Sequence, residues 1–412
     1  MPNVTDATAL PVVLTPESLF GAFFAPDAWA DPYPLYDELR ARSGLERIDT
    51  NLWVASSHAA VSQLLREPGW SSDERIATQA GAEAYDDYNP VVGNFMLFLD
   101  PPDHTRLRGL VVRAFTRRRV GDLESRMQLI VDSLVPQGSR RELDLVDDVA
   151  TPLAITVISE LLGVPLADQV RFHGWGEALA RSLDPEVLRT PEQEAAAHDA
   201  TDAFVEYFAG LITERRSRPA DDLLSALVTV EEGGDRLSFE ELVGTCMLVL
   251  VAGFETTINL IGSGMVALAA DDGARSHLAA DRTLLDTAVD ELLRFDAPAQ
   301  MNVRVAIEDQ RVGDQIVPAN DTVLNLLGAA NRDPKAFDDP HSLDVGRSPN
   351  PHVSFGGGIH HCLGAALARA EARLVFERIV CDHDVELAGA PRRRSTFTLR
   401  GYESVPIRLT PR

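Results

Sequence analysis

One stretch near the end of the chain reads Phe355-Gly356-Gly357-Gly358-Ile359-His360-His361-Cys362-Leu363-Gly364 and continues as Ala365-Ala366-Leu367-Ala368-Arg369. Three consecutive glycines make a tight backbone that can come close to a large flat ligand, and the run after Cys362 is rich in helix formers. Cys362 is therefore expected where a loop becomes a helix. Backbone N–H groups and the helix dipole stabilise an anion there, so the pattern favours a thiolate that can bind a metal.

Five positions of this stretch follow the order Phe-x-x-Gly-x-His-x-Cys-x-Gly: Phe355, Gly358, His360, Cys362 and Gly364. Before its neighbours are counted, a lone cysteine near a helix start is more often a buried structural residue. The five positions in register resemble the haem-binding loop of the cytochrome P-450 superfamily. The resemblance implies that Cys362 is the axial iron ligand, with Phe355 shielding the sulfur and His360 contacting a haem propionate. It also implies that Gly358 and Gly364 allow close approach of the porphyrin.

Composition and charge narrow the possible partners. The chain has 412 residues, 45% hydrophobic and 25% charged, as is ordinary for a globular protein with a sizeable core. Its net charge of -25 disfavours nonspecific binding to nucleic acid or an anionic membrane, because both would repel it. Residues 1–17 contain no long apolar run, so we expect neither a signal peptide nor a membrane anchor. A cytoplasmic, monomeric protein is expected.

The cysteine count and the length bound the organisation further. Cys246, Cys362 and Cys381 leave one cysteine over from any pairing, which argues against a disulfide framework. Cys246 and Cys381 are most simply packing residues. Length alone allows two or three domains, but large single enzyme domains reach this size. The resemblance implies one domain over residues 1–412, with residues 1–30 as an N-terminal extension.

A basic helix is predicted after Asp100-Pro101-Pro102-Asp103, because prolines and an acidic first turn mark a helix start. His104 and Arg108 are four residues apart and lie on one face. Alone they indicate a solvated basic helix. The resemblance implies instead that the pair binds a haem propionate.

A basic cluster follows in the same segment: Arg113, Arg117, Arg118 and Arg119. Composition alone indicates a solvated surface. On the implied fold this segment borders the haem side that carries Cys362. The cluster is then the predicted dock for an acidic ferredoxin or flavodoxin, steered by charge.

A long buried helix is predicted to begin at Ser238, where Ser238 and Glu241 form a capping box, and to run to about residue 267. Glu255 and Thr256 lie inside it, where polar groups are costly unless something uses them. In the structural alternative Thr256 bonds a helix carbonyl and Glu255 pairs with an arginine.

The segment Ala252-Gly253-Phe254-Glu255-Thr256 resembles the family's Ala-Gly-x-Glu-Thr motif over the haem. The resemblance implies that Gly253 leaves room for O₂, that Thr256 hydrogen-bonds the oxygen and that Glu255 relays protons from solvent. O–O cleavage needs protons delivered without uncontrolled water. We also expect four residues to line the substrate: Leu248, Ala252, Ala299 and Gln300.

Two further motifs extend the resemblance. Glu291 and Arg294 are three apart on a predicted helix, a spacing common in solvated pairs. They resemble the family's Glu-x-x-Arg, which joins a later arginine in a buried network that supports the Cys loop. Arg347 is the expected third member, although Leu343 stands where the family usually has Phe. Arg304, in a predicted strand at residues 303–307, is implied to bind a propionate.

Periodicity independently predicts a mainly α protein with minor strands, at residues 303–307, 310–312, 315–317, 385–387, 396–399 and 405–409. We therefore expect the cytochrome P-450 fold, a large helical part with small β-sheets, holding haem b noncovalently because no Cys-x-x-Cys-His is present. The implied reaction inserts one oxygen atom of O₂ into a small, mainly apolar substrate of secondary metabolism or catabolism. Electrons would come from NAD(P)H through separate redox proteins.

Two alternatives from other classes are open. A zinc site could form on the glycine loop, although its candidate ligands lack the paired spacing of such sites: His352, His360, His361 and Cys362. The chain could also be a haem protein that binds or senses a ligand without turnover. Retention of Glu255 and Thr256 weighs against that reading.

Overall fold

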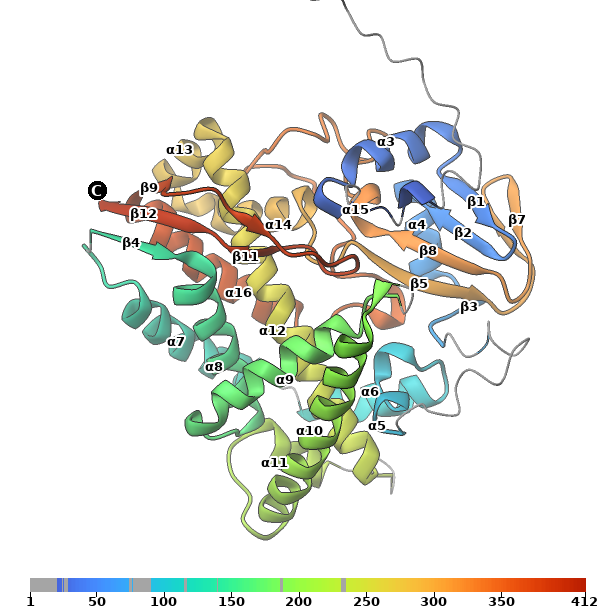
Figure 1. Ribbon diagram of the computed structural model, residues 1–412, viewed down its shortest axis with the longest axis horizontal. Coiled ribbons are helices and arrows are strands. Elements are labelled where there is room, and N and C mark those ends of the chain that lie inside the picture. Colours follow the sequence, from blue (N-terminus) through green and yellow to red (C-terminus); the bar gives the residue numbers. More distant parts are fainter. Residues whose placement is uncertain are drawn as a thin grey trace, which may run out of the picture.

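The computed structural model describes residues 21–23, 25, 29–73, 76, 90–114, 117–138, 140–185, 188–230 and 235–412. Helix α12, Phe239–Ala270, passes through the middle of the molecule (Figure 1). Its predicted capping box is present: the Glu241 N–H donates to Ser238 Oγ at 3.1 Å, and the Ser238 N–H donates to Glu241 Oε2 at 2.7 Å. Most side chains of α12 are apolar and buried, so the large core forms around it.

Other helices cover α12 on several sides, and α8, α9, α14 and α16 contact it directly. The set with its bounds is α5 (Pro90–Gly93), α6 (Asp103–Ala114), α7 (Arg117–Leu134), α8 (Thr151–Leu162), α9 (Gln169–Arg181), α10 (Pro191–Ser217), α11 (Leu223–Thr229), α13 (Asp272–Ala280), α14 (Leu285–Phe295) and α16 (Ala365–Phe376). The side chains of Arg117, Arg118 and Arg119 lie outside the described residues.

A five-stranded sheet stands beside the helices, in the order β1-β2-β8-β5-β3. Its strands are β1 (Leu45–Asp49), β2 (Leu52–Ala55), β3 (Trp70–Ser71), β5 (Met301–Ala306) and β8 (Thr322–Leu326), and only the β2–β8 pair is parallel. Successive side chains point to opposite faces. Trp53 and Ala55 therefore pack on the side of α4 (His58–Arg66), and Val54 packs on the side of α3 (Tyr33–Arg42).

Smaller sheets close the fold: β4 (Arg141–Asp144) and β9 (His383–Leu387) flank β12 (Pro406–Pro411), β6 (Gln310–Val312) pairs with β7 (Gln315–Val317), and β10 (Arg392–Arg393) pairs with β11 (Tyr402–Ser404). The strand predicted at residues 396–399 is wrong, because this segment is the loop between β10 and β11. Its N–H groups at Phe397 and Thr398 donate to the Asp184 carboxylate at 3.1 and 2.7 Å. A side chain therefore satisfies part of this backbone, and the rest of the segment forms only an isolated antiparallel bridge between Leu399 and Ala299.

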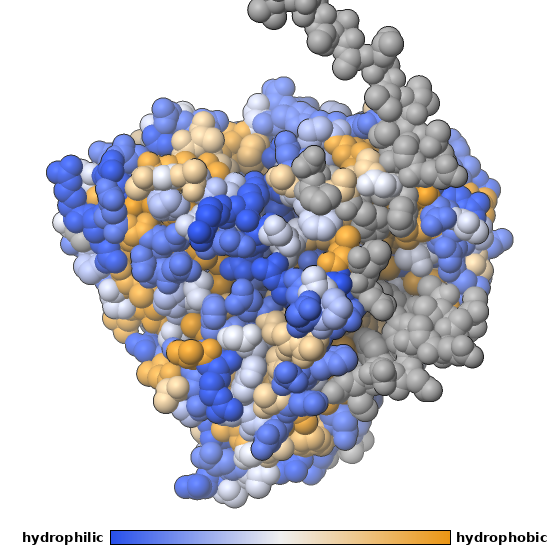
Figure 2. Space-filling model, viewed as in Figure 1, coloured by the Kyte–Doolittle hydropathy of each residue, from blue (hydrophilic) through white to orange (hydrophobic). Residues whose placement is uncertain are grey.

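Helix α12 is also long and apolar enough to cross a membrane, but 72% of its most apolar 18-residue window is buried in the protein. The core helix of a folded protein passes the same test. On the face shown in Figure 2, hydrophobic residues occur in small groups among hydrophilic ones.

Candidate active site

The loop before α16 holds Cys362 in a tight turn. The Cys362 N–H donates to the Phe355 carbonyl at 2.9 Å, and Gly356 and Gly358 have φ values of +69° and +61°. A Cβ on Gly358 would lie 2.3 Å from the carbonyl oxygen of Leu65 in α4. Gly358 is therefore required by backbone conformation and by packing on α4. A Cβ on Gly364 would meet nothing within 4 Å.

The Cys362 thiol is accessible, whereas Cys246 and Cys381 are buried. Desolvation by the surrounding protein raises the pKa of Cys362, while the Gly364 N–H and the guanidinium groups of Arg108 and Arg369 lower it. Desolvation outweighs these donors, so the pKa of Cys362 is raised overall and the local donors offset only part of that shift. Binding to a metal ion removes the proton altogether.

Basic side chains from three segments converge beside this loop. His104 of α6 is 1% exposed, and neither of its ring nitrogens has a hydrogen-bond partner among the described residues. Its ring lies 4.2 Å from that of His360, centroid to centroid. Burial, and then Arg304, His104 and Arg108, lower the pKa of His360 to about 3. Burial also lowers the pKa of Arg304 to about 10, against a smaller opposing effect of Asp100.

Within the described part of the chain, neither Arg108 nor Arg304 forms an ion pair with a carboxylate. Arg304 donates to the Val303 carbonyl at 2.7 Å, and Arg108 donates to the His361 carbonyl at 2.5 Å. A buried cation, Arg304, and a half-buried one, Arg108, both without counterions among the described residues, indicate a site for an anionic ligand. A haem with two propionates and a sulfur-bound iron fits this donor set, and these residues would hold it.

Glu291 and Arg294 form a fully buried bidentate pair in α14, with both donor–acceptor distances 2.7 Å. Arg347 Nε donates to Glu291 Oε2 at 3.0 Å, so the structure brings the three predicted network residues together. Arg294 also donates to the carbonyls of Asn331, Pro340 and Ser342 at 3.0, 2.8 and 3.0 Å. The network thus fastens the loops that precede the Cys362 turn.

The middle of α12 is accessible on one face. Leu248, Ala252 and Thr256 follow one another at four-residue spacing; Ala252 is exposed, and Leu248 and Thr256 are half-buried, although most of the helix is buried. Thr256 Oγ1 donates to the Ala252 carbonyl at 2.6 Å, the helix bond of the structural alternative. The hydroxyl oxygen still has acceptor capacity toward a ligand.

Glu255 is 3% exposed and pairs with Arg394, Oε1 to Nη1, at 3.2 Å. Its Oε2 has no hydrogen-bond partner among the described residues. Burial raises the pKa of Glu255, and Arg394 opposes that shift. Arg394 Nη1 also lies 4.0 Å from Oε1 of Glu177 in α9, whose side chain is 49% exposed. Charged groups therefore connect the surface to Glu255.

Sequence reasoning missed Arg394 and a second buried acid, Glu371 of α16. Glu371 Oε2 lies 3.4 Å from Thr257 Oγ1, and Oε1 has no partner within the described residues. Burial raises the pKa of Glu371 to about 8, although the Thr257 hydrogen bond lowers it. A glutamate inside the apolar run after Cys362 was a usable signal. Arg394 gave none, because Arg392, Arg393 and Arg394 are indistinguishable in sequence.

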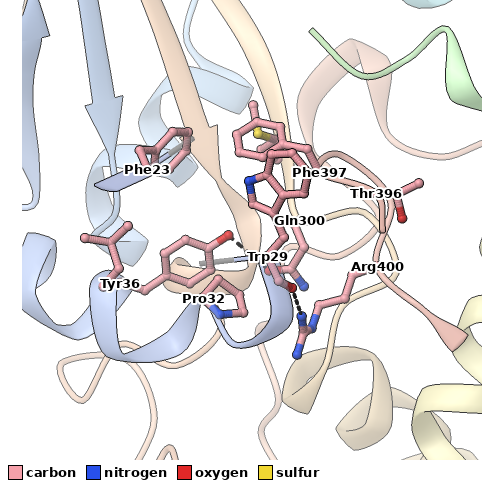
Figure 3. A pocket seen from close by; sticks show the side chains of 10 residues that line it. Phe23, Trp29, Pro32, Tyr36, Gln300, Thr396, Phe397 and Arg400 are labelled. Atoms are coloured by element: carbon pink, nitrogen blue, oxygen red, sulfur yellow. Dashed lines mark hydrogen bonds between the residues drawn. The ribbon is translucent and has the colours of Figure 1, made fainter. Parts of the chain in front are cut away.

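The side chains of the predicted substrate residues Ala299 and Gln300 lie in different surroundings. Ala299 is half-buried against the core. Gln300 is 2% exposed, donates to the Ala297 carbonyl at 2.7 Å and accepts from Tyr36 at 3.2 Å. It lines a small cavity of about 20 Å³, together with the aromatic rings of Phe23, Trp29, Tyr36 and Phe397 (Figure 3). Its contact with substrate stays a prediction.

The described residues do not form the zinc site that the sequence left open. Among the described residues, no group of three or more His, Cys, Asp or Glu side chains is placed to hold a metal ion. His352 turns toward Asp290, with 3.4 Å between Nε2 and Oδ1.

Comparison with known proteins gives one consistent result. The cytochrome P450 family model matches residues 49–402. The chain is 41% identical to the cytochrome P450 monooxygenase PikC of Streptomyces venezuelae, over 97% of this chain and 95% of that one. It is 40% identical to cytochrome P450 107B1 of Saccharopolyspora erythraea, over 93% and 96%. The ligand-free structure of CYP164A2 from Mycobacterium smegmatis superposes with a TM-score of 0.86 at 38% identity, over 95% and 99%.

The predicted fold class is therefore confirmed. The chain belongs to the cytochrome P450 family and is a haem-dependent monooxygenase.

Proposed function

We propose that this monooxygenase hydroxylates or epoxidises a largely aliphatic or polyketide-like molecule of secondary metabolism, bound against the accessible face of α12. The side chains on that face are the observation that supports this proposal. The face presents Leu248, Ala252 and Thr256 beside the buried Glu255, so an apolar surface adjoins a hydroxyl and an acid. Binding sites of small molecules commonly combine an apolar lining with few polar groups.

The cofactor is haem b, bound noncovalently with Cys362 as iron ligand and His104, Arg108, Arg304 and His360 at the propionates. When bound, the haem supplies oxygen activation, which the electron-rich thiolate favours. Phe355 covers the sulfur from the loop side. The α14 network keeps the loop in place, because removal of one member would leave a buried charge unpaired.

Thr256 and Glu255 deliver protons to the site from α12. Thr256 orients its hydroxyl at the accessible face. Glu255 passes inward protons that reach it through water from the surface near Glu177, and the permanently charged Arg394 holds its carboxylate in place. Unprotonated Glu255 accepts a proton from that side and donates it toward Thr256 through water. Its raised pKa brings this carboxyl closer to the working pH than an exposed glutamate.

Names of similar proteins support the substrate class. Relatives include the polyketide biosynthesis cytochrome P450 PksS of Bacillus subtilis, 40% identical, and vitamin D(3) 25-hydroxylase of Pseudonocardia autotrophica, 38% identical. CYP109E1 from Bacillus megaterium, 28% identical with a TM-score of 0.79, was solved with testosterone. These names point to polyketide and steroid-like molecules, which are mainly apolar.

Electrons come from NAD(P)H through a cytoplasmic ferredoxin or flavodoxin and its reductase. The predicted dock is the basic cluster of Arg113, Arg117, Arg118 and Arg119. Charge steering predicts slower reduction in Arg117→Glu/Arg118→Glu and at high salt. Reduction rates unchanged by both would remove the cluster as the dock.

The decisive experiment measures coupling of NAD(P)H oxidation to product in Thr256→Ala, with any compound that shifts the ferric haem from low to high spin. We expect continued NAD(P)H oxidation with much less product. Thr245→Ala is the matched control, since Thr245 is buried earlier in the same helix. Equal coupling in wild type and Thr256→Ala would refute the role of Thr256. Absence of product from every spin-shifting compound of the aliphatic or polyketide-like class would refute the proposed substrate class.

A further inference from the structure

Asp290 precedes Glu291 on α14, but its carboxylate contacts side chains on either side of the Cys362 loop and not the Arg294–Arg347 network. Its Oδ1 accepts from Arg369 Nε at 2.7 Å and lies 3.4 Å from His352 Nε2. Burial raises the pKa of Asp290, but His352 and Arg369 outweigh it and leave the pKa lowered. One ionised carboxylate therefore holds two side chains that come from either side of the Cys362 loop.

Both of these side chains contact Phe355. The Arg369 guanidinium carbon lies 4.5 Å from the centre of the Phe355 ring, a cation–π contact. The His352 ring lies 5.9 Å from the same ring, centroid to centroid. Phe355 is in turn bonded to the ligand residue, because its carbonyl accepts the Cys362 N–H at 2.9 Å. The ring is thus fixed from two directions.

The orientation of His352 is determined by its own hydrogen bonds. The Ser354 N–H donates to Nδ1 at 3.3 Å, so Nδ1 is an acceptor and Nε2 carries the proton that faces Asp290. Ser354 Oγ donates to the Leu293 carbonyl of α14 at 2.7 Å. The segment before the loop and the helix after it are therefore both anchored on α14.

We infer that Asp290 and Arg369 are positioning residues for the sulfur ligand: Asp290 holds the Arg369 cation on Phe355, and this cation tunes the charge that Cys362 donates to iron. The inference rests on the proposed ligand role of Cys362. It adds a second function to α14, which fastens the preceding loops through Glu291 and the Phe355 shield through Asp290.

The physical reason is electrostatic. Reduction of the haem iron would add negative charge to the iron and its thiolate ligand, and a nearby cation stabilises that charge. Only a guanidinium both pairs with a carboxylate and stacks on an aromatic ring in this way.

The test uses haem-loaded full-length Arg369→Gln, Arg369→Lys and Asp290→Asn. We expect a more negative midpoint potential in Arg369→Gln. We also expect part of its ferrous carbon-monoxide Soret band to move to the shorter wavelength of haem without a thiolate ligand. Arg369→Lys keeps the charge and should lie closer to wild type. Asp290→Asn should show the same Soret change, because Arg369 and His352 lose their anchor.

Matched controls lie on the same two helices. Arg373→Gln removes a cation of α16 that pairs with Glu124 instead, and Asp286→Asn changes an exposed acid of α14. Both should keep the wild-type potential and band. Wild-type potential and band in Arg369→Gln would overturn the inference.

If Arg369→Gln fails to load haem, Arg369→Lys and Asp290→Asn decide the question. Wild-type spectra in both would overturn the inference. Cys362→Ser separates the two hypotheses. A wild-type thiolate band in Cys362→Ser refutes the ligand role itself. If the thiolate band is lost in Cys362→Ser but the potential and band of Arg369→Gln equal those of wild type, only the tuning by Arg369 is refuted.

Discussion

The Glu291, Arg294 and Arg347 side chains that support the Cys362 loop and the buried polar side chains around α12 differ in how completely they are bonded. On the Cys362 side, the Glu291 carboxylate accepts from Arg294, Arg347 and the Asp344 N–H, and Arg294 donates to three further carbonyls. Around α12, the described residues leave Glu255 Oε2, Ser263 Oγ and Glu371 Oε1 buried without a partner.

This difference matches what the two sides must do. A complete network has one low-energy arrangement and holds a ligand residue in a fixed place. Buried polar atoms without protein partners are normally bonded to internal water. The α12 side is therefore where water and protons can reach the site, at a cost in stability. The predictions that follow test each side of this contrast.

The largest effect is expected from Glu291→Ala. The change leaves Arg294 buried without its counterion, which costs roughly 3–5 kcal/mol of unfolding free energy. Little haem-loaded protein should be recovered, as judged by the ratio of Soret to protein absorbance. Asp286→Ala, an exposed acid on the same helix, is the control and should load normally. Normal haem content in Glu291→Ala would show that the network is dispensable.

The next effect is a gain in stability in Glu371→Gln. The pKa of Glu371 is raised to about 8 from an ordinary value of 4.5. Between these values the folded protein binds more protons than the unfolded chain, so wild-type stability falls as pH rises. Each pH unit in this window is worth about 1.4 kcal/mol. The amide does not titrate, so the stability difference between the variant and wild type should grow by roughly 2 kcal/mol in the variant's favour between pH 6 and pH 8.

Urea unfolding at several pH values measures this difference. Glu403→Gln changes an exposed carboxyl and should follow wild type at every pH. Parallel stability curves for wild type and Glu371→Gln would mean that Glu371 is ionised in the folded protein.

The fold was more predictable from sequence than the contacts within the site. The bounds of β6 and β7 agree with their predicted ranges, and Ser238 caps α12 as expected, because local patterns determine them. The strand predicted at residues 396–399 failed because its partner is Asp184, more than 200 positions away.

The same limit applies to the site. Cys362, Glu255 and Thr256 stand in short motifs and could be singled out. Arg394 could not, since nothing local distinguishes it from Arg393, which instead lies 3.3 Å from Asp296. The partner of a buried charge is set by tertiary packing, and a single sequence does not encode it in any local pattern.

A smaller effect, on rate rather than folding, is expected from Glu255→Gln. Loss of the proton carrier should slow product formation about 10²-fold with normal haem content. Arg394→Met should instead move the acid limb of the pH–rate profile to higher pH, because Arg394 opposes the raised pKa of Glu255. Arg392→Met, exposed in the same hairpin, is the control. An unmoved limb in Arg394→Met would separate Arg394 from the proton path.

The smallest effect is expected at the start of α12, where bonding is complete. Ser238→Ala removes the side-chain acceptor of the Glu241 N–H and should cost about 1 kcal/mol of unfolding free energy. Ser238→Gly should cost only a few tenths, because glycine is tolerated at this position. Neither should alter haem content or the coupling of NAD(P)H oxidation to product. Altered coupling in Ser238→Ala at normal haem content would mean that α12 responds as one unit, so that the bonding of its first turn and the open face at Thr256 are not independent.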